Sequence, residues 1–91
     1  MQESSLEPIL LGTAKKLLAH STKLKALAIQ QPCSHFALML VEIVEHGQYT
    51  YHKSYLVRHA REDKPRTWRL DRLAKMLEEQ GAVKLEVRFE Q

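Results

Sequence analysis

The residues best suited to bind a charged ligand gather in one stretch around the chain's only tryptophan, Trp68. Residues 58–75 carry a local charge of +4, more than the +3 of the whole chain. Arginine presents a fixed fork of N–H donors that matches phosphate oxygens, and an aromatic ring can stack on a base. The stretch therefore predicts a contact surface for RNA or DNA, made by Arg58, Arg61, Lys64, Arg66, Trp68, Arg69 and Arg72.

The same stretch has a second interpretation, as a solvated segment that leads into an ordinary helix. Asp71 and Lys75 have the i,i+4 spacing of a helical ion pair, and Glu62 and Asp63 dilute the positive charge. Trp68 could fold back onto the apolar stripe of that helix. Basic residues at a helix start oppose the helix dipole, however, so helix stability does not explain them.

Cysteine and histidine also offer metal or nucleophilic chemistry near the ends of a predicted hairpin. Cys33 and His35 precede its first strand, and His59 ends its second strand, so the three side chains could approach one another. Such ligands suit zinc, and a thiol beside an imidazole could act as a nucleophile. No phosphate loop, paired cysteine motif or nucleophile elbow accompanies them. We therefore expect no enzymatic activity and no cofactor.

Length and composition indicate one small globular domain. The chain has 91 residues, of which 44% are hydrophobic, and a single cysteine that fits a reducing compartment. Glu3 and Glu7 stand where a signal peptide would carry positive charge, and no apolar run is long enough to span a membrane. We expect a cytoplasmic protein with no membrane partner.

The clearest structural signal is a β-hairpin built from residues 36–45 and 49–59. Gly47-Gln48 places glycine at the first central position, as a type II′ turn requires. This turn sets Glu42 opposite Lys53 and Leu40 opposite Tyr55, and it pairs Leu38 with Val57. Tyr49, Tyr51, Lys53 and Tyr55 then share one face with apolar partners, which predicts that the tyrosines cover the core rather than stack on bases.

The other face of the hairpin is also apolar. It carries Met39, Val41, Ile43, His52 and Leu56. A strand that is apolar on both faces is normally covered on both sides, and so few helices cannot cover both. The sequence therefore predicts that this face is a homodimer interface.

Two amphipathic helices and two further strands complete the expected fold. Residues 6–20 show a helical stripe, with Ser4 and Glu7 at the spacing of a capping box. Residues 67–80 show a second stripe through Leu70, Leu73, Ala74 and Leu77, with Thr67 as N-cap and Gly81 as the stop. Residues 23–30 could extend the first helix or form a strand, and we favour the strand. Residues 82–90 alternate and predict a half-exposed strand.

The order predicts an α+β fold in which two helices pack on a mainly antiparallel sheet of three or four strands. The functional hypothesis is a non-enzymatic binding or assembly domain, a homodimer that acts through protein contacts with an unidentified partner. The alternative is a nucleic-acid-binding module that uses the basic stretch. A Cys/His metal or thiol site is a third possibility.

Overall fold

The computed structural model describes residues 4–20 and 24–89, which form two helices and six strands. In chain order the elements are β1 (Ser4–Ile9), α1 (Leu11–His20), β2 (Leu24–Gln30), β3 (Phe36–His46), β4 (Tyr49–Val57), β5 (Thr67–Trp68), α2 (Leu70–Glu79) and β6 (Glu86–Arg88). The α+β class is thus confirmed.

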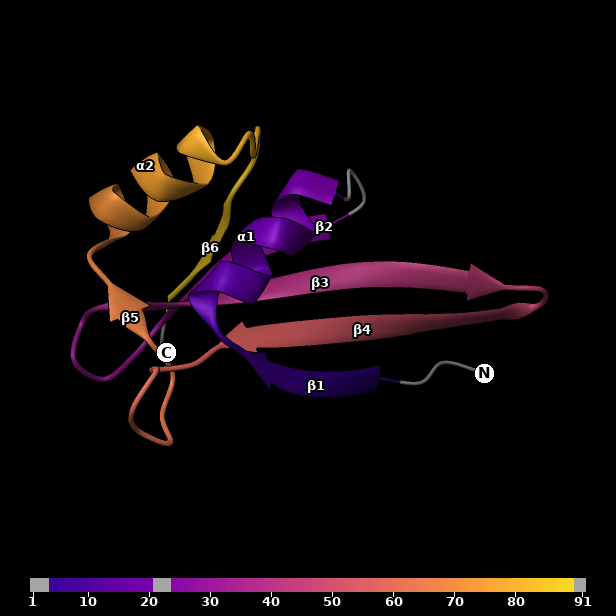
Figure 1. The fold of residues 1–91 in the computed structure, drawn as a ribbon, viewed down its shortest axis with the longest axis horizontal. Coiled ribbons are helices and arrows are strands. Elements are labelled where there is room, and N and C mark those ends of the chain that lie inside the picture. Colours follow the sequence, from indigo (N-terminus) through magenta and orange to yellow (C-terminus); the bar gives the residue numbers. More distant parts are fainter. Residues whose placement is uncertain (1–3, 21–23, 90–91) are drawn as a thin grey trace.

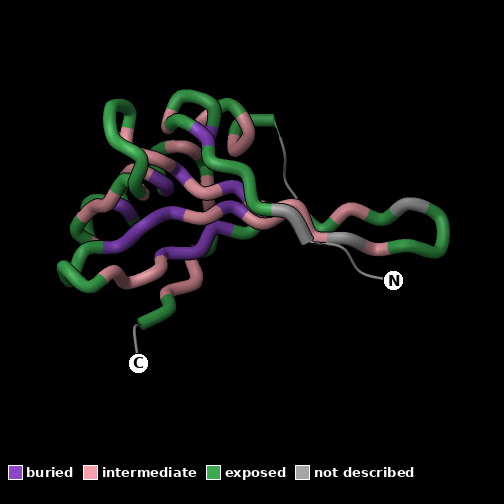
Figure 2. Tube along the Cα trace, turned by 90° about the horizontal axis from the view of Figure 1, so that it is seen from below, coloured by how far each residue is buried: buried purple, intermediate pink, exposed green. Residues whose placement is uncertain are grey.

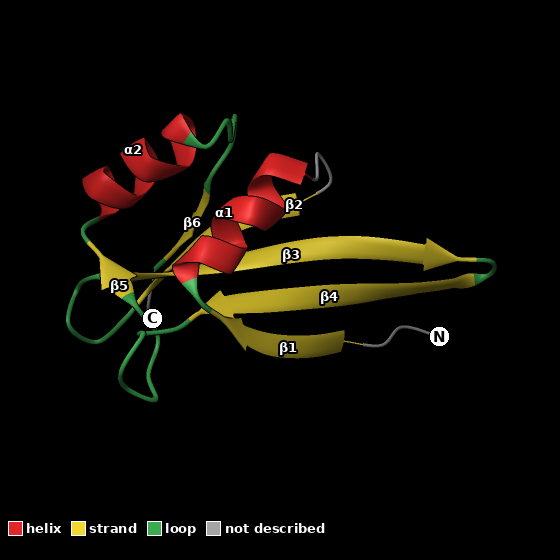
Figure 3. Cartoon of the chain, in the orientation of Figure 1, coloured by secondary structure: helices red, strands yellow, loops and turns green. Residues whose placement is uncertain are grey.

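All six described strands belong to one mixed sheet with the order β1-β4-β3-β2-β6, and β5 pairs with β3 (Figures 1 and 3). β3 pairs antiparallel with β2, β4 and β5, whereas the pairs β1–β4 and β2–β6 are parallel. Among the described strands, β3 therefore runs against all the others. The expected small, mainly antiparallel sheet is wrong, because both chain ends add parallel strands that lie far from their partners in the sequence.

The first predicted helix is wrong in its first half. Residues 4–9 form β1, which lies parallel to β4 with Ile9 beside Val57, and α1 begins only at Leu11. Ser4 and Glu7 are therefore strand residues and not a capping box. Pro8 cannot donate a ladder hydrogen bond, and β1 is an edge strand, which is where a sheet tolerates proline.

The predicted hairpin is confirmed together with its register. His46 pairs with Tyr49, Glu42 with Lys53 and Leu40 with Tyr55; the ladder ends at Met39 and Leu56, one step before the expected pairing of residues 38 and 57. Gly47 has φ +64°, and among the described non-glycine residues only Ser34 has a positive φ. Positive φ at the first turn position alone is what a type II′ turn needs. Residues 24–30 form the strand that we favoured over a longer helix.

Both helices pack on one face of the sheet, where the core lies. The core cluster joins Leu73 and Leu77 of α2 and Ala14 of α1 to every second residue of the strands, including Leu38 and Leu40. In the view of Figure 2 the helical turns lie above the strands and none lies below them, and the far end of the β3–β4 hairpin projects beyond the buried body. Alternation along the strands fixes which residues reach this core.

The second predicted helix is shorter than expected at its start. Thr67 is not an N-cap, because Thr67 and Trp68 pair with β3 as β5; the cap position falls to Arg69, whose side chain makes no capping hydrogen bond. Ala74 is exposed, although the stripe placed it in the core with Leu73 and Leu77. Gly81 ends the helix as predicted.

The last predicted strand is mostly not a strand. Only Glu86–Arg88 pair with β2, and residues 82–85 pass beside β2 without a ladder. The alternation still orients the paired part, since Val87 packs against the core together with Leu85. Val83 is 93% exposed and Phe89 is 66% exposed, so only two of the four apolar residues of the alternation pack against the core. Phe89 nevertheless meets the Phe36 ring edge to face at 6.0 Å.

Candidate functional site

The first candidate site is the face of the sheet that carries no helix, which we call the open face. The register places the predicted interface residues there together, with Met39 opposite Leu56 and Ile43 opposite His52. Val41 lies between them on the same face. The structure thus brings all five predicted residues onto one surface.

The open face is wider than the hairpin. The pairing of β1 with β4 places Leu6 and Pro8 on the open face, and the pairing of β2 with β3 places Leu27 and Ile29 there. The sequence analysis missed these four residues because it placed two of them on a helix and did not fix the register of β2. The sequence did contain a signal for them. Residues 6 and 8, like residues 27 and 29, are apolar and two positions apart, which is the spacing of one face of a strand.

Exposure on the open face is uneven. Leu6 is 60% exposed and Ile43 is 54% exposed, whereas Leu27 at the centre is only 2% exposed although no described helix covers it. Met39, Val41, His52 and Leu56 are half-buried by their neighbours. This face is mainly apolar, with Ser54 between Leu6 and Val41, and an apolar sheet face normally packs against another layer.

Charged side chains border the open face at its β6 side. Lys25 pairs with Glu86 at 3.1 Å, and Glu86 also accepts a hydrogen bond from Arg88 Nε at 3.1 Å. Both contacts hold the pKa of the Glu86 carboxyl below its ordinary value, the Lys25 hydrogen bond most strongly. These three residues lie on the open face by register, so it has an apolar centre and a charged rim on that side.

The second candidate site is the basic loop, residues 58–66, which protrudes where the chain leaves the sheet after β4 (Figure 1). The loop closes on itself: Arg58 bridges Pro65, and the Arg66 backbone N–H donates to the Val57 carbonyl at 3.0 Å. The chain then re-enters the sheet as β5, again beside β3. This closure holds both ends of the loop against the body of the protein.

The predicted nucleic-acid residues lie on this loop, on β5 and at the start of α2. Arg61, Lys64, Arg66, Arg69 and Arg72 are exposed, and Arg58 is half-buried. Trp68 is half-buried against the core, and the Arg66 guanidinium lies 5.1 Å from the centre of its ring. The indole thus anchors an arginine, and its packing against the core follows the second interpretation of the sequence.

Two of the predicted cations, one in the loop and one at the N-cap of α2, are paired with nearby carboxylates. Lys64 Nζ lies 2.7 Å from Glu62 Oε2, which raises the pKa of Lys64 and lowers the pKa of Glu62. Arg69 Nε lies 3.4 Å from Asp71 Oδ1. All four side chains are more than half exposed, so solvent screens these pairs and they stabilise the fold little.

The three metal or thiol candidates do not form a cluster. Among the residues that the structure describes, no three His, Cys, Asp or Glu side chains gather closely enough to hold a metal ion. His59 Nδ1 accepts a hydrogen bond from the Arg61 backbone N–H at 3.2 Å. Cys33 is exposed and lies near enough to Lys64 to add slightly to the raised pKa of that lysine, and His35 is exposed as well.

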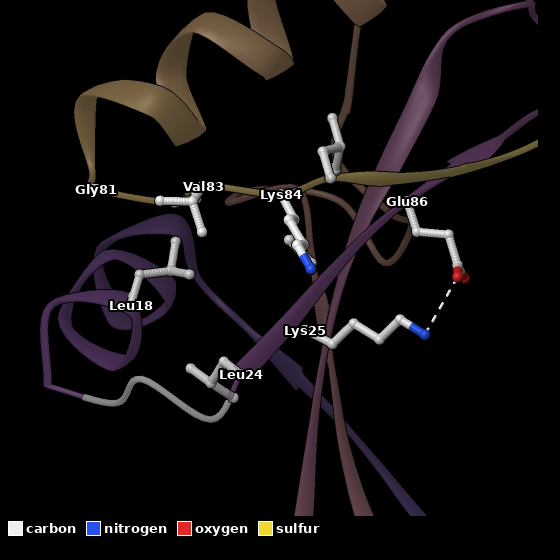
Figure 4. A pocket seen from close by; sticks show the side chains of 10 residues that line it. Leu18, Leu24, Lys25, Gly81, Val83, Lys84 and Glu86 are labelled. Atoms are coloured by element: carbon white, nitrogen blue, oxygen red, sulfur yellow. Dashed lines mark ion pairs between the residues drawn. The ribbon is translucent and has the colours of Figure 1, made fainter.

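A hollow of about 920 Å³ opens between α1, the start of β2 and the segment before β6 (Figure 4). Leu18, Leu24 and Val83 form apolar walls, and Lys84 reaches toward β2. Glu86 at its edge is already paired with Lys25. The hollow exists because β6 pairs only with residues 27–29, which leaves the first part of β2 without a neighbour on that side.

The chain matches no protein-family model, no curated protein and no solved structure. No helix in the described part of the chain has the length and apolar character needed to cross a membrane.

Proposed function

We propose that this protein is a non-enzymatic assembly domain that forms a homodimer through the open face of its sheet. The observation that carries the proposal is the joint placement of Met39, Val41, Ile43, His52 and Leu56 on a face that neither helix covers. Burying partly exposed Ile, Leu, Met and Val side chains is favourable by about 25 cal/mol per Å² of apolar surface.

The dimensions of the open face support a second copy as the cover. Strands lie about 4.8 Å apart and rise about 3.4 Å per residue, so four strands over six residues span a flat area of about 400 Å². Side chains that stand above this plane add accessible surface, which brings each copy toward the lower end of specific interfaces, about 600 Å² per partner. A two-fold axis would place the same residues on both sides of the interface.

The charges on the open face also suit self-association. On its β6 side the charged groups are Lys25, Glu86 and Arg88, and they already form ion pairs with one another. Glu45 lies on the same face at the exposed end of the hairpin, opposite Thr50 and away from the apolar residues at the centre. The β6 side would therefore meet a second copy without an unpaired charge of its own. Among the five predicted interface residues, the only titratable side chain is that of His52, which lies opposite Ile43.

The electrostatics of the described surface fit binding better than catalysis. Among the described residues, the side chains whose pKa values shift are Lys53, Glu62, Lys64 and Glu86. Each shift arises from a neighbouring exposed group or, for Lys53, from Tyr55. Catalytic groups more often acquire their shifts by burial in a cleft. A second copy or another protein is the partner that such a surface accommodates.

The test is the solution mass of the wild type and of two single variants. We expect the wild type to have about twice the chain mass of 10.6 kDa by light scattering or sedimentation. Ile43→Glu should return the protein to monomer mass, because each dimer loses two buried isoleucines at roughly 2 kcal/mol each, about a thousandfold in Kd.

Tyr49→Glu is the matched control. Tyr49 is 60% exposed, close to the 54% of Ile43, and it lies on the same hairpin but on the opposite side of the strands. The control should therefore remain dimeric. A monomeric wild type at about 100 μM, or equal dissociation of both variants, would remove the proposal.

A further inference from the structure

The basic loop and the first turn of α2 form a cationic surface that the assembly proposal does not use. The loop stands at the end of β4, and β5 shows which way it faces: Thr67 pairs with Ala37 on the open face, whereas Trp68 pairs with Phe36 on the helix side. Arg66 follows Trp68 to the helix side, since its guanidinium lies over that ring. A dimer through the open face would thus leave Arg66 and the first turn of α2 accessible.

The positive charge of this surface is largely unneutralised. Of the predicted residues, Lys64 and Arg69 have carboxylate partners, while Arg58, Arg61, Arg66 and Arg72 have none within 4 Å among the described residues. Asp63 is the one acid of residues 58–72 that has no basic partner within 4 Å in the described part of the chain. Four arginines without a carboxylate partner therefore lie within 15 consecutive residues, three of them exposed and Arg58 half-buried.

We propose that this surface binds the phosphodiester backbone of a nucleic acid. Guanidinium groups bind phosphate with two parallel hydrogen bonds, and several of them along a convex loop suit an extended polyanion better than a small enclosed ligand. Binding to such a polyanion gains free energy from released counterions, which a single carboxylate partner does not supply. Trp68 holds Arg66 in place, so part of the cost of ordering that long side chain is already met in the free protein.

The test is fluorescence anisotropy with labelled 20-nucleotide single-stranded RNA and a 20-base-pair DNA duplex, titrated with the full chain. If four phosphates are contacted, log K against log salt should fall with a slope between about −3 and −4. Binding to either probe supports the proposal, and the preferred probe identifies the class of nucleic acid. An unchanged anisotropy for both probes at 20 mM salt would overturn it.

Two triple variants separate the loop from the net charge of the chain. Arg61→Gln/Arg66→Gln/Arg72→Gln should weaken binding about a hundredfold at 100 mM salt and flatten the slope by about 2 to 3. Lys15→Gln/Lys16→Gln/Lys84→Gln removes the same charge elsewhere and should change affinity less than about threefold. Equal losses in both variants would show that only net charge matters and would overturn the assignment.

Competition with poly-glutamate of equal length tests the other polyanion. Displacement as effective as that by unlabelled nucleic acid would indicate an acidic protein partner and overturn the proposal. Solution mass is read in parallel, so a failure of nucleic-acid binding and a failure of dimerisation remain separate results.

Discussion

At the scale of single residues, a backbone angle at Gly81 decides where α2 ends. Gly81 has φ +90°, and its N–H donates to the Glu78 carbonyl at 3.0 Å, while the Ala82 N–H donates to the Leu77 carbonyl at 3.0 Å. These two bonds form a Schellman motif, which satisfies carbonyls that the end of a helix leaves unpaired. A side chain at this position strains the left-handed backbone even though the space around it is open.

Gly81→Ala should therefore destabilise the protein by about 1 kcal/mol, measured as the free energy of unfolding in urea. Gly12→Ala is the control, because Gly12 lies inside α1 with nothing within 4 Å of an added Cβ and without a positive φ. The control should stabilise by a few tenths to about 1 kcal/mol. Equal effects of the two substitutions would contradict this account of Gly81.

At the same scale, the proposed phosphate binding of the basic loop depends on the guanidinium groups of its arginines. Arg58 and Arg66 stand at the two closed ends of the loop, and Arg61 lies in the loop between them. Replacing an arginine there by lysine would keep the charge and lose the planar fork, so the nucleic-acid proposal depends on residue type as well as on charge.

At the scale of elements, α2 shows how packing selects among the residues of an amphipathic stripe. Leu73 and Leu77 are buried in the core, with exposed fractions of 0% and 1%, while Ala74 is exposed. The difference follows from how the helix is rotated about its axis. Met76 packs against the core beside Leu73 and Leu77, and at about 100° per residue Ala74 falls on the opposite side of this face.

Leu77→Ala should reduce the free energy of unfolding by about 2–5 kcal/mol, because it opens a cavity in the core. Ala74→Lys should change it by less than about 0.5 kcal/mol, since an exposed helical position accepts lysine. Urea unfolding of both variants gives the comparison. A large loss from Ala74→Lys would show instead that residue 74 faces the core, as the stripe in the sequence suggested.

At the scale of the whole molecule, the C-terminal part of the chain joins the sheet through β6. Only three residues of β6 pair with β2. The Lys25–Glu86 ion pair links the two strands at the first end of this short parallel ladder. Since the folded pKa of Glu86 is lowered, its contribution to stability is present above the unfolded value of about 4.3 and is lost as pH falls through the folded value.

Glu86→Gln should therefore lower the urea midpoint at pH 7, and this difference should shrink as pH falls below about 4 and the wild-type carboxyl takes up its proton. The comparison is best made in the Ile43→Glu background, so that self-association does not contribute to stability. Glu79→Gln removes an exposed carboxylate that has no ion pair among the described residues, and it should show no such pH dependence. A difference that stays the same from pH 7 down to about pH 2 would rule out the ion pair as its cause.

The two candidate surfaces differ in how far the sequence could predict them. The basic loop is a run of neighbouring residues, so composition was enough to place its cations together. The open face draws residues from four strands, and only the part within one hairpin was predictable, because the turn at Gly47-Gln48 fixed that register locally. Leu6, Pro8, Leu27 and Ile29 joined it through pairings between distant segments.

By itself, the sequence determined the features that depend on neighbours along the chain. These are the II′ turn, the hairpin register, the helix stop at Gly81 and the alternation that divides each strand into two faces. Only the tertiary structure decided that residues 4–9 are a parallel edge strand and that Thr67 and Trp68 belong to the sheet. It also decided that the six described strands form a single sheet. Those choices depend on hydrogen bonds to strands far away in the sequence, and such partners can override a local helical pattern.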